Sequence, residues 1–198
     1  TLAENHGFTE FDRSKTYAPG DKVYVNNRGK ALMLCVIGKE PISNGVMIAA
    51  AHIDSPRIDL KANPLYETDG LAYFKTHYYG GIKKYQWPAI PLALYGTVVK
   101  ADGSVIDISI GDSDDEPKFV ITDLLPHLAR EQYKRPAPQL IRGEELNILI
   151  GSRPFNDDEA SEAVKLNIMR LINEKYGMIE QDFVSAELSL VPAFNVSD

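Results

Sequence analysis

The chain has 198 residues, of which 44% are hydrophobic and 25% charged, and its formal net charge is -7. This length and composition are enough to bury a core as one large domain or two small ones, which argues against a disordered protein. The acidic balance repels phosphate backbones and anionic lipid heads, so neither nucleic acid nor a membrane surface is an expected partner. The short basic and aromatic cluster GGIKKYQW is read as a solvated loop.

Cysteine content and hydropathy indicate the compartment. The single cysteine, Cys35, lies in an apolar run, so the sequence predicts no disulfide framework and no thiolate metal cluster. No stretch of about 18 uninterrupted apolar residues occurs. The first residues, TLAENHGFTEFD, lack the basic and apolar regions of a signal peptide. We therefore expect a cytoplasmic protein.

Three strand-like runs fill the first third of the chain. KVYVNN (22–27), ALMLCVIG (31–38) and VMIAAAHI (46–53) are separated by segments rich in Gly, Pro, Asn and Ser, which are typical of turns. The third run is apolar on both faces. This pattern favours a central strand that is covered on both sides.

A hairpin is predicted in the middle of the chain. LALYGTVVKADGSVIDISIG (92–111) offers two strands about the Asp-Gly dipeptide at 102–103. Isoleucines recur at every second position from Ile106 to Ile110, so they share one face of the second strand.

The remaining elements mix helices and strands. ITDLLPHLAREQ predicts a short helix over 123–133, with Pro126 in its first turn, where the missing N–H costs little. A strand is expected over 145–152. Residues 157–177 carry acids at one end, an apolar stripe and a terminal glycine, which together indicate a helix. FVSAELSLVPA (183–193) reads as a strand.

Strands and helices do not alternate strictly along the chain, as they do in the βαβ units of a parallel sheet. The sequence therefore predicts two regions: the start of an α/β sheet up to about residue 58, and a β-rich α+β domain after it.

His52 and Asp54 stand one residue apart at the end of the third apolar run, directly before Ser-Pro. In an extended backbone the two side chains share a face, and ligands commonly bind beyond the ends of such strands. On one reading, His52 ligates a metal through one ring nitrogen, and Asp54 accepts a hydrogen bond from the other or shapes the next part of the site. On the second reading, His52 is a partly buried structural histidine whose proton a carboxylate holds. The bare pattern leaves both open.

Longer segments resemble the aspartyl-aminopeptidase-like family of metalloaminopeptidases, which includes vacuolar aminopeptidase. AAHIDSPRIDLK resembles the AHTDSP-type segment of that family, and HYYGGIKKYQW is similar to its Tyr-Gly-Gly segment that leads to a tryptophan. ITDLLPHLAREQ resembles a helix of the family's middle domain, and QDFVSAELSLVPA occupies the place of strands that precede its remaining site. These matches occur in the right order and span nearly all of the chain.

The resemblance implies an exopeptidase that releases N-terminal amino acids from peptides with two metal ions, usually zinc and in some cases cobalt or manganese. His52 matches the family's first metal-ligating histidine, and Asp54 matches the residue that orients the ligand sphere. Residues 1–58 and 188–198 match an aminopeptidase-like catalytic domain with a mixed sheet, and residues 59–187 match a dimerisation domain inserted into it. Family dimers commonly assemble into tetrahedral dodecamers, so a homo-oligomer is expected.

Most of the family's metal ligands have no counterpart in the sequence. A bridging aspartate, paired glutamates, a further aspartate and a last histidine follow the strand that FVSAELSLVPA resembles, whereas the sequence ends at Asp198. One imidazole does not complete a coordination shell. We therefore expect an N-terminal fragment without peptidase turnover of its own.

The chain also departs from the family within the matched segments. WPAIPL (87–92) stands where some members carry FDRD. Some members place a middle-domain histidine in the neighbouring subunit's active site. At the matching helix turn this chain has Glu131, and His127 lies one turn earlier, so the sequence leaves open whether either reaches such a site. His6 and His77 have no motif behind them.

Two other functions compete with the enzyme. The first is a non-catalytic oligomerisation or binding module of the same ancestry, which a natural stop after Asp198 would favour. The second is a related metal-dependent hydrolase of non-peptide amides, which substrate profiling would separate.

Overall fold

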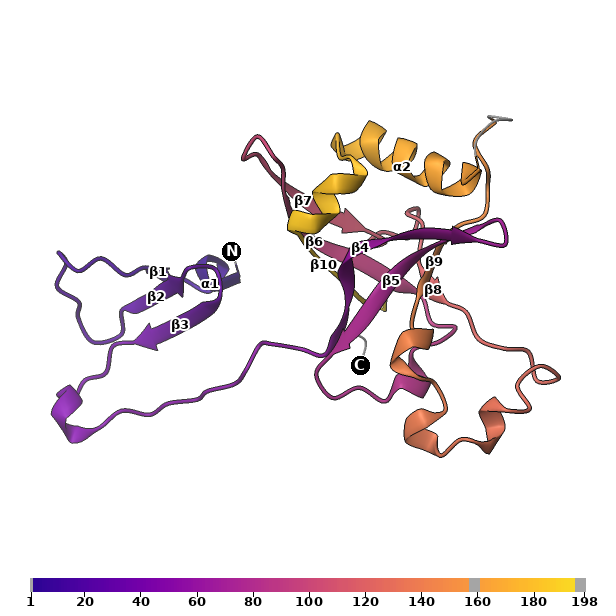
Figure 1. The fold of residues 1–198 in the computed structure, drawn as a ribbon. Helices are drawn as coiled ribbons and strands as arrows, with labels where there is room; N and C mark the ends of the chain where they lie inside the picture. The colour runs from indigo at the N-terminus through magenta and orange to yellow at the C-terminus, as the bar shows by residue number, and fades with distance from the viewer. Residues whose placement is uncertain (1, 157–160, 195–198) are drawn as a thin grey trace. The chain divides into compact units, whose positions relative to one another are not determined.

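The computed structural model describes residues 2–156 and 161–194, and the chain divides into two compact units. Unit 1 is Thr1–Ile53 and unit 2 is Asp54–Asp198 (Figure 1). The division lies close to the boundary predicted near residue 58. The assignment of 1–58 and 188–198 to a catalytic domain and of 59–187 to a dimerisation domain stays a prediction.

Unit 1 contains a small mixed sheet in the order β1-β2-β3. β1 pairs with β2 in parallel, and β2 pairs with β3 in antiparallel register from Lys22 opposite Val36 to Asn27 opposite Ala31. The strands predicted over 22–27 and 31–38 are therefore confirmed, the second ending at Val36. The elements are α1 (Leu2–Asn5), β1 (Thr9–Glu10), β2 (Lys22–Asn27) and β3 (Ala31–Val36).

The central strand predicted over 46–53 is wrong. Residues 46–56 form no strand, and the apolar side chains of Val46, Met47 and Ile48 are exposed. A strand forms where a neighbour supplies backbone hydrogen bonds. No strand in the part of the chain that the structure describes pairs with this run, so its apolar pattern is not matched by burial.

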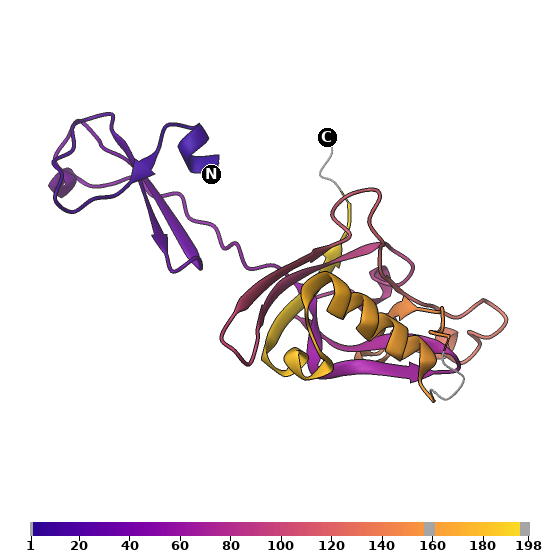
Figure 2. The same ribbon diagram turned by 90° about the horizontal axis from the view of Figure 1, so that it is seen from above.

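Unit 2 is built on a curled seven-stranded antiparallel sheet in the order β7-β6-β10-β4-β5-β9-β8 (Figure 1). Helix α2 lies across one face of this sheet and contacts β4, β5 and β9, as the view from above shows (Figure 2). The elements are β4 (Arg57–Thr68), β5 (Leu71–Tyr79), β6 (Leu92–Val99), β7 (Val105–Ile110), β8 (Val120–Ile121), β9 (Ile148–Gly151), α2 (Ala163–Tyr176) and β10 (Ala186–Pro192).

The predicted hairpin, at one edge of this sheet, and the last strand are confirmed. β6 and β7 pair from Leu94 opposite Ile110 to Val99 opposite Val105. β10 lies between β6 and β4. At Gly96, with φ +149°, an added Cβ would stand 1.9 Å from the carbonyl oxygen of Glu187, so this close approach of β6 and β10 requires glycine.

The helix predicted over 123–133 is wrong. This stretch forms turns, and a short 3-10 helix covers Gln132–Lys134. The Asp123 carboxylate accepts hydrogen bonds from the Leu124 N–H at 2.8 Å and from Gln132 Nε2 at 2.9 Å. Such local side-chain bonds compete with helical ones, and Leu125 and Leu128 find no buried face to cover.

Helix α2 confirms the helix predicted over 157–177, with Gly177 in the left-handed conformation at its C-terminal end. Residues 157–160, where the sequence places acids for the first turn, lie outside the described residues. A carboxylate from β4 has this role: Glu67 Oε2 accepts the N–H groups of Val164 at 3.0 Å and Lys165 at 2.9 Å. No described helix is both long and apolar enough to cross a membrane.

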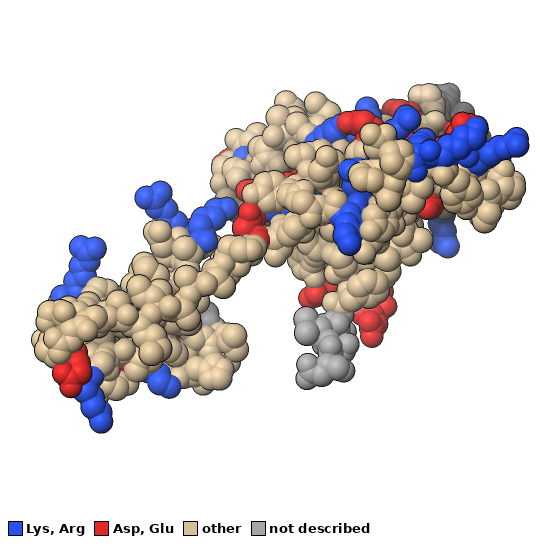
Figure 3. All heavy atoms as spheres, turned by 90° about the horizontal axis from the view of Figure 1, so that it is seen from below, with Lys and Arg blue, Asp and Glu red and all other residues tan. Residues whose placement is uncertain are grey.

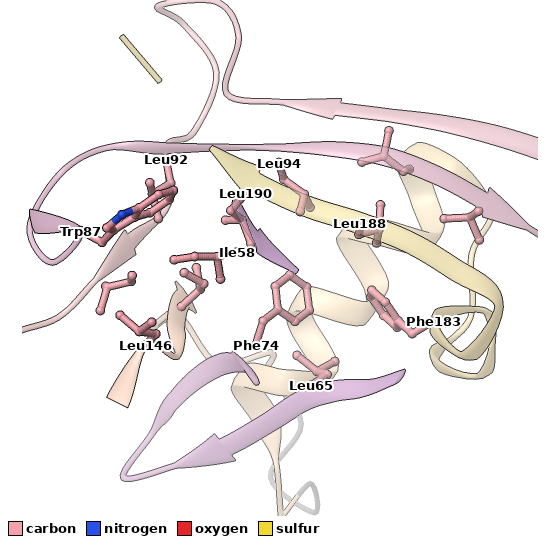
Figure 4. Packing of buried hydrophobic residues seen from close by; sticks show 14 of the residues in the cluster. Ile58, Leu65, Phe74, Trp87, Leu92, Leu94, Leu146, Phe183, Leu188 and Leu190 are labelled. Carbon is pink, nitrogen blue, oxygen red and sulfur yellow. The ribbon is translucent and has the colours of Figure 1, made fainter. Parts of the chain in front are cut away.

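The core of unit 2 lies inside the curled sheet, where side chains from several strands point toward one another (Figure 4). Strands β4, β5, β6 and β10 each contribute buried residues, and Phe74 and Phe183 meet edge to face at 5.5 Å between ring centroids. The labelled members are Ile58, Leu65, Phe74, Trp87, Leu92, Leu94, Leu146, Phe183, Leu188 and Leu190.

Candidate functional site

The two residues predicted to form a site fall on either side of the division between the units. His52 is an exposed residue of unit 1, and Asp54 is the first residue of unit 2. Because residues 46–56 form no strand, the prediction that both side chains share the face of a strand end is wrong. Their roles as metal ligand and orienting carboxylate stay predictions.

Asp54 is held by two neighbours in unit 2. Tyr79 Oη donates a hydrogen bond to Asp54 Oδ2 at 2.7 Å, and Arg57 Nη1 donates to Asp54 Oδ1 at 3.1 Å. The Asp54 side chain is 59% exposed, so it lies at the surface while its two oxygens are oriented by donors.

Arg57 connects Asp54 to Asp59 of β4. Its Nε donates to Asp59 Oδ1 at 2.8 Å, and its guanidinium lies over the ring of Tyr79, 4.1 Å from the centroid. Asp59 Oδ1 also accepts a hydrogen bond from Ser189 Oγ of β10 at 2.7 Å. Residues from β4, β5 and β10 therefore form one network, which we call the Asp54 network: Asp54, Arg57, Asp59, Tyr79 and Ser189.

The network changes the acidity of two of its members. The hydrogen bond to Asp54, helped by the carboxylate charge, raises the pKa of Tyr79, so the phenol stays a proton donor at neutral pH. Burial lowers the pKa of Arg57, but the charges of Asp59 and Asp54 and their hydrogen bonds outweigh burial and leave this pKa raised.

The sequence did not point to Arg57, Tyr79 or Ser189. Arg57 follows the Ser-Pro pair directly, which was the one available signal. Tyr79 faces Arg57 in the β4–β5 register, and Ser189 faces Asp59 across β10 and β4. These juxtapositions depend on strand pairing that residue patterns did not define.

The described residues do not by themselves fit a metal centre. Across 2–156 and 161–194, no group of three or more His, Cys, Asp or Glu side chains could hold an ion. The imidazole of His52 suits zinc chemically, but a structural or catalytic zinc needs at least three protein ligands. A zinc centre that includes His52 therefore needs ligands from outside this set.

The other candidate residues lie elsewhere in unit 2. His127 and Glu131 are exposed in the turns that replace the predicted helix, and Glu131 pairs with Lys134. His77 is exposed on β5, opposite Asp59 in the strand register. Whether His127 or Glu131 reaches a neighbouring subunit's site stays open, as the sequence leaves it.

Charged side chains of both signs are interspersed on the face of unit 2 shown in Figure 3. Some basic residues of unit 2 form ion pairs with acids. Lys61 pairs with Glu144 at 3.0 Å, and Arg135 pairs with Glu145 at 2.9 Å. The expectation that nucleic acid is no partner stays a prediction.

Comparisons with known proteins identify the family. The family described as aminopeptidase I zinc metalloprotease (M18) matches residues 1–197. A probable M18 family aminopeptidase 1 of Clostridium acetobutylicum is 52% identical over 200 residues, which cover 99% of this chain and 43% of that protein. The chain belongs to the aminopeptidase I (M18) family of zinc metalloproteases, which confirms the resemblance.

Solved structures agree with this assignment. An M18 family aminopeptidase from Thermotoga maritima superposes with a TM-score of 0.86 at 44% identity, covering 98% of this chain and 42% of that one. Aminopeptidase I from Borrelia burgdorferi gives 0.81 at 40% identity, covering 99% and 44%. The chain thus has the fold of the matching part of M18 aminopeptidases and spans less than half the length of these relatives.

Proposed function

We propose that the native gene product containing this chain is a zinc-dependent aminopeptidase that releases N-terminal amino acids from peptides. The observation that carries the proposal is the AHIDSP segment with its oriented Asp54 carboxylate, inside a family match that covers residues 1–197. Zinc, when bound, would supply a water of lowered pKa as the nucleophile. His52 would be one ligand, and Asp54 would orient the ligand sphere.

The proposed centre holds two ions, and its remaining ligands come from outside the described residues. For this reason we propose that the 198-residue chain has no turnover alone. We also propose a homo-oligomer, a dimer or a larger assembly, in which residues 59–187 form the dimerisation domain. The name of a structural relative from S. cerevisiae, 19% identical with a TM-score of 0.60, describes that protein as a dodecamer.

A non-catalytic oligomerisation or binding module is the second candidate. It is favoured by the lack of any group of three or more potential metal ligands among the described residues. In this case the AHIDSP segment would be inherited structure without a metal.

The experiment compares the native gene product with the 198-residue chain. Intact mass under denaturing conditions first gives the length of the native product. Both proteins are then stripped of metal, reloaded with zinc, and assayed for amino acid release from peptides with free and with acetylated N-termini. We expect zinc-dependent release by the native product on free N-termini alone, and loss of this release in His52→Ala. A native product of about the length of this chain, without release, would support the module instead.

A further inference from the structure

Helix α2 packs against one half of the sheet in unit 2, and a cavity lies between the helix and the other half. The helix contacts β4, β5 and β9. At β9 the approach is close, because a Cβ added to Gly151 would stand 2.6 Å from Ile168 Cδ1. Toward β6, β7 and β10, the side chains of the helix and of the strands enclose a cavity of about 240 Å³.

The cavity is lined almost entirely by apolar side chains. Phe74 and Phe183 meet edge to face at its floor, and both lie near Leu94 and Leu188 in the core (Figure 4). Ile108 of β7 and Leu171 of α2 also line it. Such a surface gains free energy when an apolar molecule replaces water.

The two lining residues that carry polar side-chain ends use them elsewhere. Lys118 Nζ donates to the carbonyl oxygens of Gly111 at 2.5 Å and Ser113 at 2.6 Å, and Tyr176 Oη donates to that of Ser109 at 3.3 Å. Among the described residues, no buried side-chain polar atom lacks a hydrogen-bond partner. A charged ligand would therefore lose its hydration without compensation inside this cavity.

Size and access limit the ligand further. An apolar cavity of about 150 Å³ binds benzene, so the larger volume here suits a molecule of about ten carbon atoms. Ile108 and Phe183 are buried, whereas Leu171 is 46% exposed, so the cavity opens beside Leu171. A folded partner would cover only this rim, but a slender small molecule can reach the floor.

We propose that unit 2 binds one small, uncharged, hydrocarbon-like molecule of about ten carbon atoms in the cavity between α2 and strands β6, β7 and β10. Because such a ligand contacts both the helix and the sheet, it stabilises the folded state by mass action. The site is separate from His52 and Asp54, and it does not depend on the proposed aminopeptidase activity.

The test titrates n-butylbenzene into the 198-residue chain and follows the Ile and Leu methyl signals by NMR. We expect saturable shifts at one molecule per chain for the lining residues Ile108, Ile110 and Leu188, and a raised thermal midpoint. Methyl signals of unit 1, such as those of Leu34, should not move. The bulkier 1,3,5-triisopropylbenzene should bind at least about tenfold more weakly, since it exceeds the cavity.

Variants that fill the cavity test its location. Leu171→Phe from the helix and Ile110→Phe from β7 should each weaken n-butylbenzene binding about tenfold or more, because the added ring occupies the ligand's volume. Leu166→Phe is the matched control: Leu166 also belongs to α2, is 42% exposed and does not line the cavity. It should leave the affinity within about twofold.

Several outcomes would overturn the site. These are the lack of saturable shifts in the wild-type chain, shifts confined to the exposed apolar residues of unit 1, and unchanged affinity in the cavity-filling variants. Leu171 signals that depend on protein concentration, without n-butylbenzene binding, would identify an interface between copies and also overturn it. Because the two variants fill the cavity from opposite walls, one stays informative if the other does not fold.

Discussion

The two units of the chain differ in how they treat their apolar residues. In unit 2, buried side chains of several strands form one connected cluster. In unit 1, Val23 is the one buried hydrophobic among the described residues. Large hydrophobic side chains are exposed along β3 and the segment that follows it, namely Leu32, Met33, Leu34, Val36, Ile42, Val46, Met47, Ile48 and Ile53.

This difference shows that an apolar pattern and a formed core are separate properties. Burial removes apolar surface from water and stabilises by roughly 25 cal/mol per Å². Unit 2 buries apolar surface within its own sheet. The small sheet of unit 1 has exposed faces and gains little of this stabilisation. The family match runs through both units, so sequence relatedness does not indicate which one folds alone.

The largest expected effect comes from separating the units. A fragment of residues 54–198 should unfold cooperatively in urea and give a dispersed NMR spectrum, because its core is internal. A fragment of residues 1–53 should show neither property. A cooperative transition in the isolated 1–53 fragment would contradict the comparison.

A pair of leucines tests the comparison at single side chains. Leu190→Ala in the fully buried centre of β10 should lower the free energy of unfolding by about 2–5 kcal/mol. Leu34→Ala in β3, where the side chain is 52% exposed, should change it by about 0.5 kcal/mol or less. Urea midpoints of the two variants give the measurement, and equal losses would show that unit 1 has a core after all.

The close approach of β6 and β10 gives the next effect. Gly96→Ala should destabilise unit 2 by about 1–3 kcal/mol or more, because the new Cβ would stand 1.9 Å from the Glu187 carbonyl oxygen. Gly81→Ala is the matched control, since no atom lies within 4 Å of its added Cβ. Thermal midpoints should fall for the first variant alone, and an unchanged midpoint for Gly96→Ala would mean that the strands are further apart.

The smallest effect is electrostatic. The N–H groups of Gly111 and Asp112 donate to the Glu116 carboxylate and lower its pKa in the folded protein. The stabilisation is present above the unfolded pKa of about 4.3 and is lost as the pH falls through the lower folded pKa. Glu116→Gln should flatten the decline in urea midpoint between neutral and acidic pH, and Asp114→Asn controls for the change in charge. An equally steep decline in Glu116→Gln would contradict this role.

Local signals in the sequence predicted much of unit 2. The 102–103 turn with alternating isoleucines gave the β6–β7 hairpin, and the apolar stripe ending in Gly177 gave α2. Two elements were predicted wrongly. Residues 46–53 have no pairing strand among the described residues, and the Asp123 side chain bonds to Gln132 in a stretch that was predicted to be helical. In the candidate site, the motif indicated Asp54, but Tyr79 reaches it from β5, where the strand register sets Tyr79 opposite Arg57.

The central proposal is that His52 ligates zinc in a centre whose other ligands come from outside the described residues. Metal analysis after dialysis against excess zinc and then zinc-free buffer tests it most directly, on the native gene product, its His52→Ala variant and the 198-residue chain. We predict two zinc ions per native chain, fewer in His52→Ala, and none retained by the 198-residue chain. Two ions retained by His52→Ala, or by the 198-residue chain alone, would contradict the claim.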